Sequence, residues 1–253
     1  MLAESYINYQ VNNYIGTIEF FTPHHNSMPS SMLKKLTETI QNASKDDAAK
    51  VIILKSGGVK TFCAGASFDE LLSINTEADG EIFFSGFANV INAMRKSSKL
   101  IIGIVQGKAI GGGVGLIAAC DYAYATMAAD IKLSELAIGI GPFVIGPVVE
   151  RKIGTTFTYE MSIDADNFRS AEWAREKGLY AAVFEDIDTL LDATNKLAVT
   201  LSNYSAEAMK EVKKAFWNNT DHWDTLLYKR AAISGRLVLT DFTKEILQAF
   251  KNK

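Results

Sequence analysis

The sequence predicts an α/β protein in which short apolar strands alternate with amphipathic helices. Two observations support this prediction: short β-branched runs recur as far as Leu133, and residues spaced as on one helix face follow most of them. A chain of 253 residues that is 48% hydrophobic and 22% charged can enclose a full core. Its four prolines and 18 glycines are too few for a fibrous chain, so we expect one large domain, or one domain with an appendage.

The first elements are a predicted hairpin and a helix. Strand-forming residues alternate over residues 6–21, and Asn12-Asn13 supplies the turn between two runs. After a loop that contains Pro23 and Pro29, a serine at position 30 or 31 can cap a helix that extends to about residue 43. The apolar stripe of this helix is formed by Met32, Leu33, Leu36 and Ile40.

Strands and helices then continue to alternate along the chain. Short apolar runs predict buried strands at residues 51–54, 100–105, 122–125 and 131–133. Helical spacing predicts helices at residues 68–72, 81–94, 111–119 and 143–153. Because the helices alternate with the strands, each helix is expected to cover the sheet that has just formed.

From Ser170 onwards the sequence becomes mainly helical. Helices are predicted at residues 171–176 and 187–201, and a charged helical tail follows over 206–250, with Gly235 as its main break. The tail carries large apolar side chains that a solvated helix would not keep: Phe216, Trp217, Trp223, Leu226, Leu227 and Phe250. We therefore expect the tail to pack on the body of the protein, on another subunit, or on both.

Composition argues against several classes of function. With 26 basic and 29 acidic residues the net charge is -3, so we expect no nucleic-acid partner. Cys63 and Cys120 stand in apolar stretches without metal-ligand spacing, which predicts buried thiols and no metal site. Gln106 and Lys108 interrupt the most apolar region, so no membrane span is expected. The start of the chain lacks a basic segment, and a cytoplasmic location is expected.

Two small-residue segments, each following a strand, are candidates for ligand binding. Within residues 61–70, Ala64, Gly65 and Ala66 would let a ligand reach the backbone, although a tight, closely packed turn is the alternative. Three glycines at 111–113 open a helix, where exposed N–H groups and the helix dipole can hold a negative oxygen. Close helix packing is the alternative there, and no acidic residue completes a dinucleotide-binding motif.

A third segment, residues 133–143, contains Glu135 as its only ionisable residue. Loss of hydration among apolar neighbours would raise the pKa of this carboxyl and make it a base that works near neutral pH. An exposed glutamate at a strand end is the alternative explanation. The segment alone leaves both interpretations open.

Taken in order, the three segments resemble the crotonase superfamily, also called the enoyl-CoA hydratase/isomerase family. The resemblance extends from the first hairpin to about Gly178, and residues 244–250 resemble the family's closing helix. It implies a spiral of ββα units with a C-terminal helical region used for trimerisation, usually in a dimer of trimers. We therefore expect a core with an acyl-CoA site over residues 1–195, and a helical region over 196–253 that packs on the core or on a neighbouring subunit.

The resemblance also implies an acyl-CoA thioester as the substrate. Its carbonyl oxygen would lie between the backbone amides of Ala66 and Gly112, which would stabilise an enolate. The resemblance also implies that the loop around Ala64 lies along the adenine of CoA. The residues expected to contact the substrate are Ala64, Gly65, Gly111, Gly113 and Gly115. Coenzyme A is part of the substrate, so no separate cofactor is expected.

The sequence departs from the family's hydratases at one position. Those enzymes use two glutamates, and this chain has Gly115 where the first is expected, whereas Glu135 matches the second. The stretch from Glu135 to Phe143 looks like that of the Δ3,Δ2-enoyl-CoA isomerases, which work with one glutamate. The favoured prediction is therefore a double-bond shift in an enoyl-CoA, with Glu135 as the proton shuttle.

Three alternatives to this prediction stay open. An enoyl-CoA hydratase would take a second polar group from another segment, and an acyl-CoA decarboxylase would use the same oxyanion hole without a strong base. A non-catalytic crotonase-fold protein would be a scaffold or would bind RNA.

The aromatic residues Phe83, Phe84 and Phe87 fit either the core or the wall of an acyl pocket. The lysines that fit either a solvated face or a contact with CoA phosphates are Lys210, Lys213, Lys214, Lys244, Lys251 and Lys253.

Overall fold

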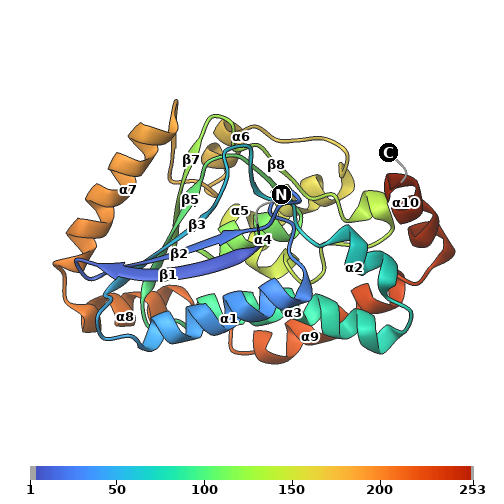
Figure 1. Cartoon of the computed structure of the whole chain (residues 1–253), viewed down its shortest axis with the longest axis horizontal. Coiled ribbons are helices and arrows are strands. Elements are labelled where there is room, and N and C mark those ends of the chain that lie inside the picture. Colours follow the sequence, from blue (N-terminus) through green and yellow to red (C-terminus); the bar gives the residue numbers. More distant parts are fainter. Residues whose placement is uncertain (1–3, 252–253) are drawn as a thin grey trace.

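The computed structural model describes residues 4–251, in which strands and helices alternate and form two sheets (Figure 1). The larger sheet has the strand order β1-β2-β3-β5-β7-β9. Its strands are β1 (Tyr6–Asn12), β2 (Ile15–Phe21), β3 (Val51–Ser56), β5 (Leu100–Val105), β7 (Tyr122–Thr126) and β9 (Ala182–Phe184). The smaller sheet has the order β4-β6-β8, formed by β4 (Thr61–Cys63), β6 (Lys108–Ile110) and β8 (Ile131–Lys132).

Helices follow or flank these strands throughout the described residues. The first five are α1 (Ser30–Lys45), α2 (Phe68–Ser73), α3 (Glu77–Lys96), α4 (Gly112–Ala119) and α5 (Gly146–Ile163), with a short 3₁₀ turn, η1 (Leu136–Ile138), before α5. The C-terminal part contains α6 (Ala171–Glu176), α7 (Ile187–Ser202), α8 (Ala206–Phe216), α9 (Trp223–Leu237) and α10 (Asp241–Lys251). The predicted alternation of strands and helices is confirmed.

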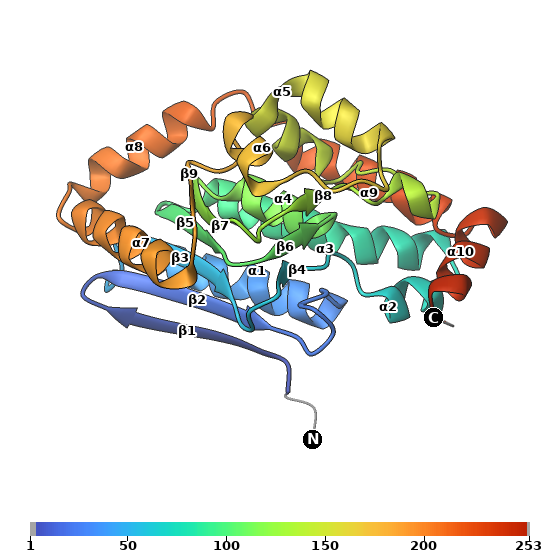
Figure 2. The same ribbon diagram turned by 90° about the horizontal axis from the view of Figure 1, so that it is seen from above.

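Three successive turns of the chain repeat one pattern. Each turn places a first strand in the larger sheet and a second in the smaller sheet, as β3 and β4, then β5 and β6, then β7 and β8. Corresponding strands of successive turns are parallel neighbours. Helices α2 and α3 follow the first turn, α4 the second, and η1 and α5 the third (Figure 2). This repeat is the spiral of ββα units that the resemblance implies.

The N-terminal hairpin forms as predicted, but its turn lies one residue further along. Asn12 pairs with Ile15, so Asn13 and Tyr14 occupy the two turn positions. Both have positive φ, 50° and 61°, as a turn that matches the right-handed twist of the strands requires. The sequence pointed to Asn12-Asn13 because asparagine tolerates this conformation better than tyrosine does.

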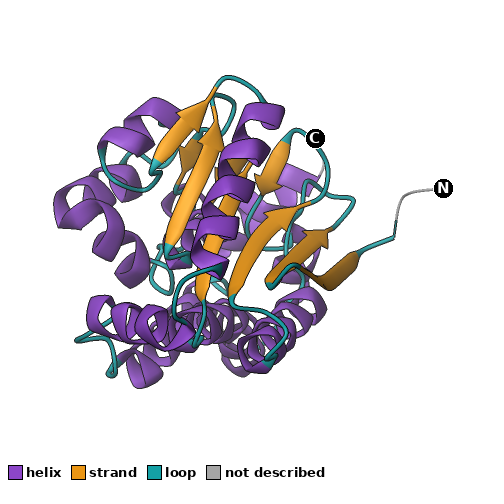
Figure 3. Cartoon of the chain, turned by 90° about the vertical axis from the view of Figure 1, so that its left-hand side faces the viewer, coloured by secondary structure: helices purple, strands orange, loops and turns teal. Residues whose placement is uncertain are grey.

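The first four residues of strand β3, Val51 to Leu54, are apolar without interruption because both faces of the strand are covered there. Val51 and Ile53 face α7, whereas Ile52 and Leu54 contribute to the main core. A parallel strand that is covered on both faces is expected to be continuously hydrophobic. Figure 3 shows α7 in front of the strands and a row of helices beneath them.

Two helices extend beyond the positions where the sequence predicts that they end or break. Helix α5 continues to Ile163, because Gly154 (φ 81°) forms a kink at which the helix resumes. Gly235 lies inside α9, and the tail is instead interrupted at residues 217–222 and 238–240. A β-carbon on Gly235 would lie 2.5 Å from the backbone nitrogen of Glu81, so this glycine allows α9 to approach α3 closely.

The C-terminal helices pack on the rest of the same chain. Helix α9 lies along α3, and α10 contacts α2 and η1. Helices α7 and α8 lie at the opposite end of the molecule (Figure 2). The boundary expected after residue 195 falls inside α7. Cys63 and Cys120 are both buried and unpaired, as predicted, and no helix within residues 4–251 is long and apolar enough to cross a membrane.

Candidate active site

The two small-residue segments meet because they leave neighbouring strands at the same edge of the smaller sheet. Strands β4 and β6 are parallel, and Cys63 pairs with Ala109. The backbone then bends through Gly65 (φ 84°) and Gly111 (φ 53°). A β-carbon on Gly65 would lie 2.8 Å from the carbonyl oxygen of Ile110 and 3.3 Å from the amide nitrogen of Gly112. The two segments are therefore in direct contact, and Gly65 has no room for a side chain.

Two backbone amides in these segments are free to bind a ligand. Met28 donates to the carbonyl oxygen of Gly65 (2.8 Å) and accepts from the amide of Ser67 (3.3 Å), which fixes the loop but leaves the amide of Ala66 unused. Gly112 is the first residue of α4, so its amide has no partner within the helix. Within the described residues neither amide has an acceptor. Two fixed donors that line one cavity can stabilise a developing oxyanion.

Glu135 projects into the same cavity from the short connection between β8 and η1. Its carbonyl oxygen accepts hydrogen bonds from the amides of Ile138 (3.2 Å) and Ile140 (3.0 Å), which fix the backbone around it. Its carboxyl lies beside Gly111, where a β-carbon would be 2.8 Å from Oε1. Any residue other than glycine at position 111 would therefore displace the carboxyl group.

One oxygen of the Glu135 carboxyl group is shielded from water, although the residue as a whole is half-buried. Its Oε2 atom is buried and has no hydrogen-bond partner among the described residues. Burial raises the pKa of Glu135 to about 7, with its own backbone amide opposing the shift. A carboxyl with this pKa exchanges a proton readily near neutral pH, so Glu135 can act as both base and acid.

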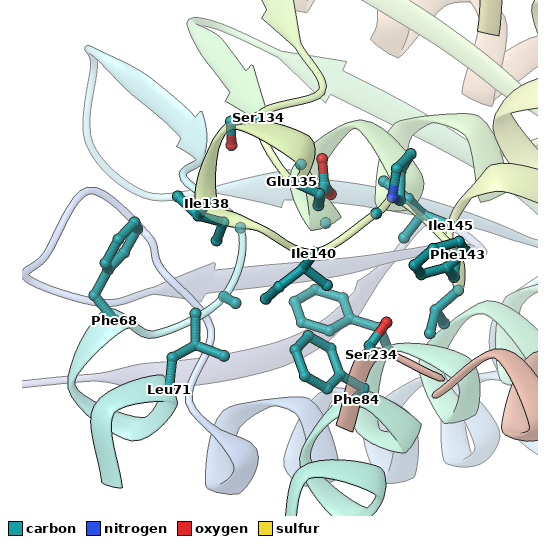
Figure 4. Close-up of a pocket in the computed structure, with 18 of the residues that line it drawn as sticks. Phe68, Leu71, Phe84, Ser134, Glu135, Ile138, Ile140, Phe143, Ile145 and Ser234 are labelled. Atoms are coloured by element: carbon teal, nitrogen blue, oxygen red, sulfur yellow. The ribbon is translucent and has the colours of Figure 1, made fainter. Parts of the chain in front are cut away.

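The cavity around these groups is mainly apolar (Figure 4). About 590 Å³ of space without protein atoms, part of it open solvent, adjoins these groups. The apolar side chains that line it are Phe68, Leu71, Phe84, Phe87, Ile138, Ile140, Pro142, Phe143, Val144 and Ile145. Glu135 is the one ionisable side chain among the described lining residues, and the hydroxyl groups come from Ser134 and Ser234. Such a cavity suits a hydrocarbon chain attached to a reactive polar group.

Most of the residues predicted for the site line this cavity, and two do not. Ala64, Gly65, Ala66, Gly111, Gly112 and Glu135 all lie in its wall. Gly113 packs against Cys63, where a β-carbon would be 2.4 Å from the carbonyl oxygen. Gly115 packs against Ile145, where a β-carbon would be 2.5 Å from Cγ2. In this chain Gly113 and Gly115 therefore lie in packing contacts behind the cavity wall.

The aromatic residues of α3 belong to the core, and two of them also reach the cavity. Phe83, Phe84 and Phe87 are all buried, and Phe84 and Phe87 also line the cavity. Sequence reasoning did not identify Ser234, which lies in α9 and reaches the cavity only because α9 packs along α3. No local pattern around Ser234 indicates that contact.

The predicted roles of the C-terminal lysines need one correction. Lys213 is buried, and its Nζ donates to Oδ2 of Asp121 (2.8 Å) and to the carbonyl oxygen of Lys99 (2.9 Å). It therefore belongs neither to a solvated face nor to a phosphate site on this chain. Lys210 and Lys214 are exposed, whereas Lys253 lies outside the described residues. Among the described residues, no group of three or more His, Cys, Asp or Glu side chains is arranged to hold a metal ion.

Comparison with known proteins identifies the class to which this fold and cavity belong. The family model described as enoyl-CoA hydratase/isomerase matches residues 10–253, so the chain belongs to the enoyl-CoA hydratase/isomerase family. The crystal structure of an enoyl-CoA hydratase from Bacillus halodurans superposes with a TM-score of 0.90, covering 97% of this chain and 100% of that chain. The sequence identity is 21%, so this match concerns the fold. The predicted crotonase fold is confirmed.

Curated relatives include both reaction types within the family. The mitochondrial Delta(3,5)-Delta(2,4)-dienoyl-CoA isomerase of Mus musculus is 26% identical over 243 residues, which cover 90% of this chain and 73% of the relative. The short-chain-enoyl-CoA hydratase of Clostridium acetobutylicum is 27% identical over 230 residues, covering 90% of this chain and 87% of the relative. Identities this similar do not distinguish an isomerase from a hydratase, so the choice depends on the site.

Proposed function

We propose that this protein shifts the double bond of an enoyl-CoA, with Glu135 as the proton shuttle. The observation that carries the proposal is the single ionisable group of the cavity. Among the described lining residues Glu135 alone can exchange a proton near pH 7, and the unused amides of Ala66 and Gly112 line the same cavity. An isomerase needs one such group, because a single base can remove a proton from one carbon and return it to another.

The reaction follows from these three groups. The thioester oxygen of a 3-enoyl-CoA would accept hydrogen bonds from the amides of Ala66 and Gly112. The Glu135 carboxylate would take a proton from C2, and the electron pair of the broken C–H bond would spread over the double bond and the thioester oxygen as a dienolate. The protonated carboxyl would then return the proton at C4, which leaves the double bond between C2 and C3. One oxyanion donor typically contributes about 3 kcal/mol to such a step.

The packing at Gly115 favours this reaction over hydration. The family's hydratases use a second glutamate, and the resemblance puts that residue at position 115. Here the space beside Gly115 is filled by Ile145, so the chain lacks both the carboxylate and the room for it. We therefore regard hydration of a 2-enoyl-CoA as an outcome for the test to exclude.

The decisive experiment follows deuterium from the solvent into the substrate. In D₂O the protein is incubated with 3-enoyl-CoAs of several chain lengths, and mass spectrometry measures deuterium at C2 and C4. We expect incorporation and formation of the 2-enoyl-CoA, and we expect Glu135→Gln to abolish both while it retains acyl-CoA binding. Glu38→Gln, an exposed glutamate on α1, is the matched control.

Three results would contradict the proposal. No deuterium incorporation with any chain length would exclude proton abstraction. Formation of a 3-hydroxyacyl-CoA from a 2-enoyl-CoA at a comparable rate would favour the hydratase. Unchanged turnover in Glu135→Gln would remove Glu135 from the mechanism.

We also propose that the chain assembles as a trimer or as a dimer of trimers. Support comes from apolar side chains that the single chain leaves uncovered on α8, where Phe216 is 75% exposed and Val212 is 51% exposed. Light scattering after size-exclusion chromatography should give the mass of a trimer or a hexamer. A monomer at micromolar concentration would contradict this proposal.

A further inference from the structure

Ser234 presents an unused hydroxyl group to the active-site cavity from the C-terminal part of the chain. The residue is 1% exposed and lines the same cavity as Glu135. Its side chain lies beside Phe84, on the side of the cavity away from Glu135 and Ser134 (Figure 4). Within the described residues its Oγ has no hydrogen-bond partner. A hydroxyl group that is this buried normally has a partner.

Other serine and threonine hydroxyl groups in the helices of this chain make a hydrogen bond that Ser234 lacks. Several of them donate to the carbonyl oxygen four residues earlier in the same helix: Thr37, Thr158, Ser162, Thr194 and Thr200. This bond is the usual local solution for a serine or threonine in a helix. Ser234 does not make it, so its donor and acceptor capacity is available to a molecule in the cavity.

The position of Ser234 is fixed by close packing on both sides of α9. The adjacent Gly235 lies against Gly80 of α3, with no room for a β-carbon on either glycine. One turn before Ser234, the Nη1 atom of Arg230 donates to the carbonyl oxygen of Phe143 (3.3 Å). Helix α9 is therefore held against α3 and against the segment that forms the cavity wall. A fixed polar group in such a wall can discriminate between ligands.

The other residues that line the cavity limit which polar group of a ligand can bind to Ser234. The side chains labelled around it in Figure 4 include Phe84, Ile140 and Phe143, all apolar. No basic side chain lines the cavity among the described residues, so a carboxylate would be desolvated there without a counter-charge. A neutral hydroxyl or carbonyl oxygen has no such penalty and can bond to a serine hydroxyl.

Building on the proposed function, we propose that Ser234 selects acyl-CoA substrates whose acyl chain carries a neutral oxygen, either a hydroxyl or a carbonyl group. Oγ of Ser234 forms the hydrogen bond with this oxygen. A plain hydrocarbon chain in the same place leaves Oγ buried without a partner. Loss of one buried hydrogen bond corresponds to about a tenfold weaker affinity or more, so the oxygenated chain should bind at least about tenfold more tightly.

The test uses ligands that bind without reacting. Dissociation constants are measured by calorimetry for saturated acyl-CoAs from butanoyl- to octanoyl-CoA, and for the same chains with a terminal hydroxyl or an oxo group on the next-to-last carbon. The length series moves the oxygen stepwise through the cavity. We expect at least one oxygenated ligand to bind about tenfold more tightly than its plain counterpart. Ser234→Ala should remove this preference without weakening the binding of the plain chain.

Ser162→Ala is the matched control, because its hydroxyl is bonded within α5 and should leave the preference unchanged. The inference is overturned if the wild-type protein shows no preference at any length, or if Ser234→Ala retains it. Failure of the proposed function gives a different pattern. Acyl-CoAs would then bind, with or without the Ser234 preference, but no 3-enoyl-CoA would exchange deuterium. If no acyl-CoA of either series binds, both proposals are wrong.

Discussion

The side chain of Ile145 fills the space beside Gly115, and its Cγ2 atom lies only 2.5 Å from where a β-carbon on that glycine would be. This contact joins α4 to the start of α5 just behind the cavity wall, which contains Ile145 itself. The family's hydratases are expected to have their first glutamate at position 115. In this chain the side chain of Ile145 fills the space that such a glutamate would need.

Gly115→Ala should destabilise the protein by about 1–3 kcal/mol, because the added methyl group overpacks a closed contact. Urea unfolding measures the change. Combining it with Ile145→Ala should recover part of the loss, as expected for two residues in contact. Additive effects of the two substitutions would show that the contact does not exist. Gly115→Glu alone should give no 3-hydroxyacyl-CoA from a 2-enoyl-CoA.

The pH dependence of catalysis should report on Glu135. Removal of the C2 proton requires the carboxylate form, and burial raises the pKa of this group to about 7. We therefore expect kcat/KM for a 3-enoyl-CoA to rise with pH and to level off above a midpoint near 7. Stopped-flow measurements between pH 5 and 9 (about the range where such a pKa is visible) would test this. A midpoint near the usual glutamate value would show that the carboxyl is hydrated in the free enzyme.

The stability of the fold should depend on pH through the same group. The pKa of Glu135 is raised from 4.5 in the unfolded chain to about 7 in the fold, so its contribution is fully present below pH 4.5 and is lost as pH rises through 7. Glu135→Gln should therefore be more stable than the wild type above pH 7, by about 1–3 kcal/mol. The difference should vanish towards pH 4.5.

The buried ion pair between Lys213 and Asp121 should stabilise the protein without a role in catalysis. Asp121 also accepts hydrogen bonds from the Nε1 atom of Trp217 and the amide of Ile101, both at 2.7 Å. Lys213→Ala leaves this carboxylate without its counter-charge and should cost about 3 kcal/mol in the free energy of unfolding. At a temperature where the variant is folded, kcat should equal that of the wild type. A selective loss of acyl-CoA affinity would instead restore Lys213 as a ligand residue.

The contact of Gly235 with α3 should control both stability and the placement of Ser234. A β-carbon at Gly235 meets backbone atoms of α3, which cannot move aside as a flexible side chain would. Gly235→Ala should therefore lower stability by about 2 kcal/mol or more and shift α9. Because Ser234 moves with α9, we also expect Gly235→Ala to weaken the preference for oxygenated acyl-CoAs. Gly146→Ala is the control, because the nearest atom to its added methyl group would be Nη1 of Arg230, 3.4 Å away. This substitution should change neither the free energy of unfolding nor the preference for oxygenated acyl-CoAs.

The strands and helices were predictable where the local sequence decides them. Strand β3 and helix α4 follow directly from apolar runs and an opening glycine. The sequence predicts Gly235 as a helix break because a glycine has the same local signature at a kink, at a helix end and at a close helix contact. Only the packing of α9 on α3 shows which of these applies to Gly235.

The site was predictable to the extent that its parts lie in recognisable segments. Ala66, Gly112 and Glu135 could be proposed because each stands in an unusual local pattern. Their meeting in one cavity depends on the pairing of β4, β6 and β8, which are only two or three residues long. The sequence predicts β8 at residues 131–133 but does not predict β4 or β6. Ser234 could not be found, because its approach to the cavity depends on contacts between distant helices.

The groups that we propose for the reaction and the group that we propose for substrate selection come from different parts of this chain. The amides and the carboxyl group belong to successive coils of the spiral, whereas Ser234 belongs to a helix laid against the spiral from outside. If both proposals hold, mutations in α9 should change which acyl groups bind while the two backbone amides stay in place. A chimera that exchanges this helix between relatives should inherit its chemistry from one parent and its substrate range from the other.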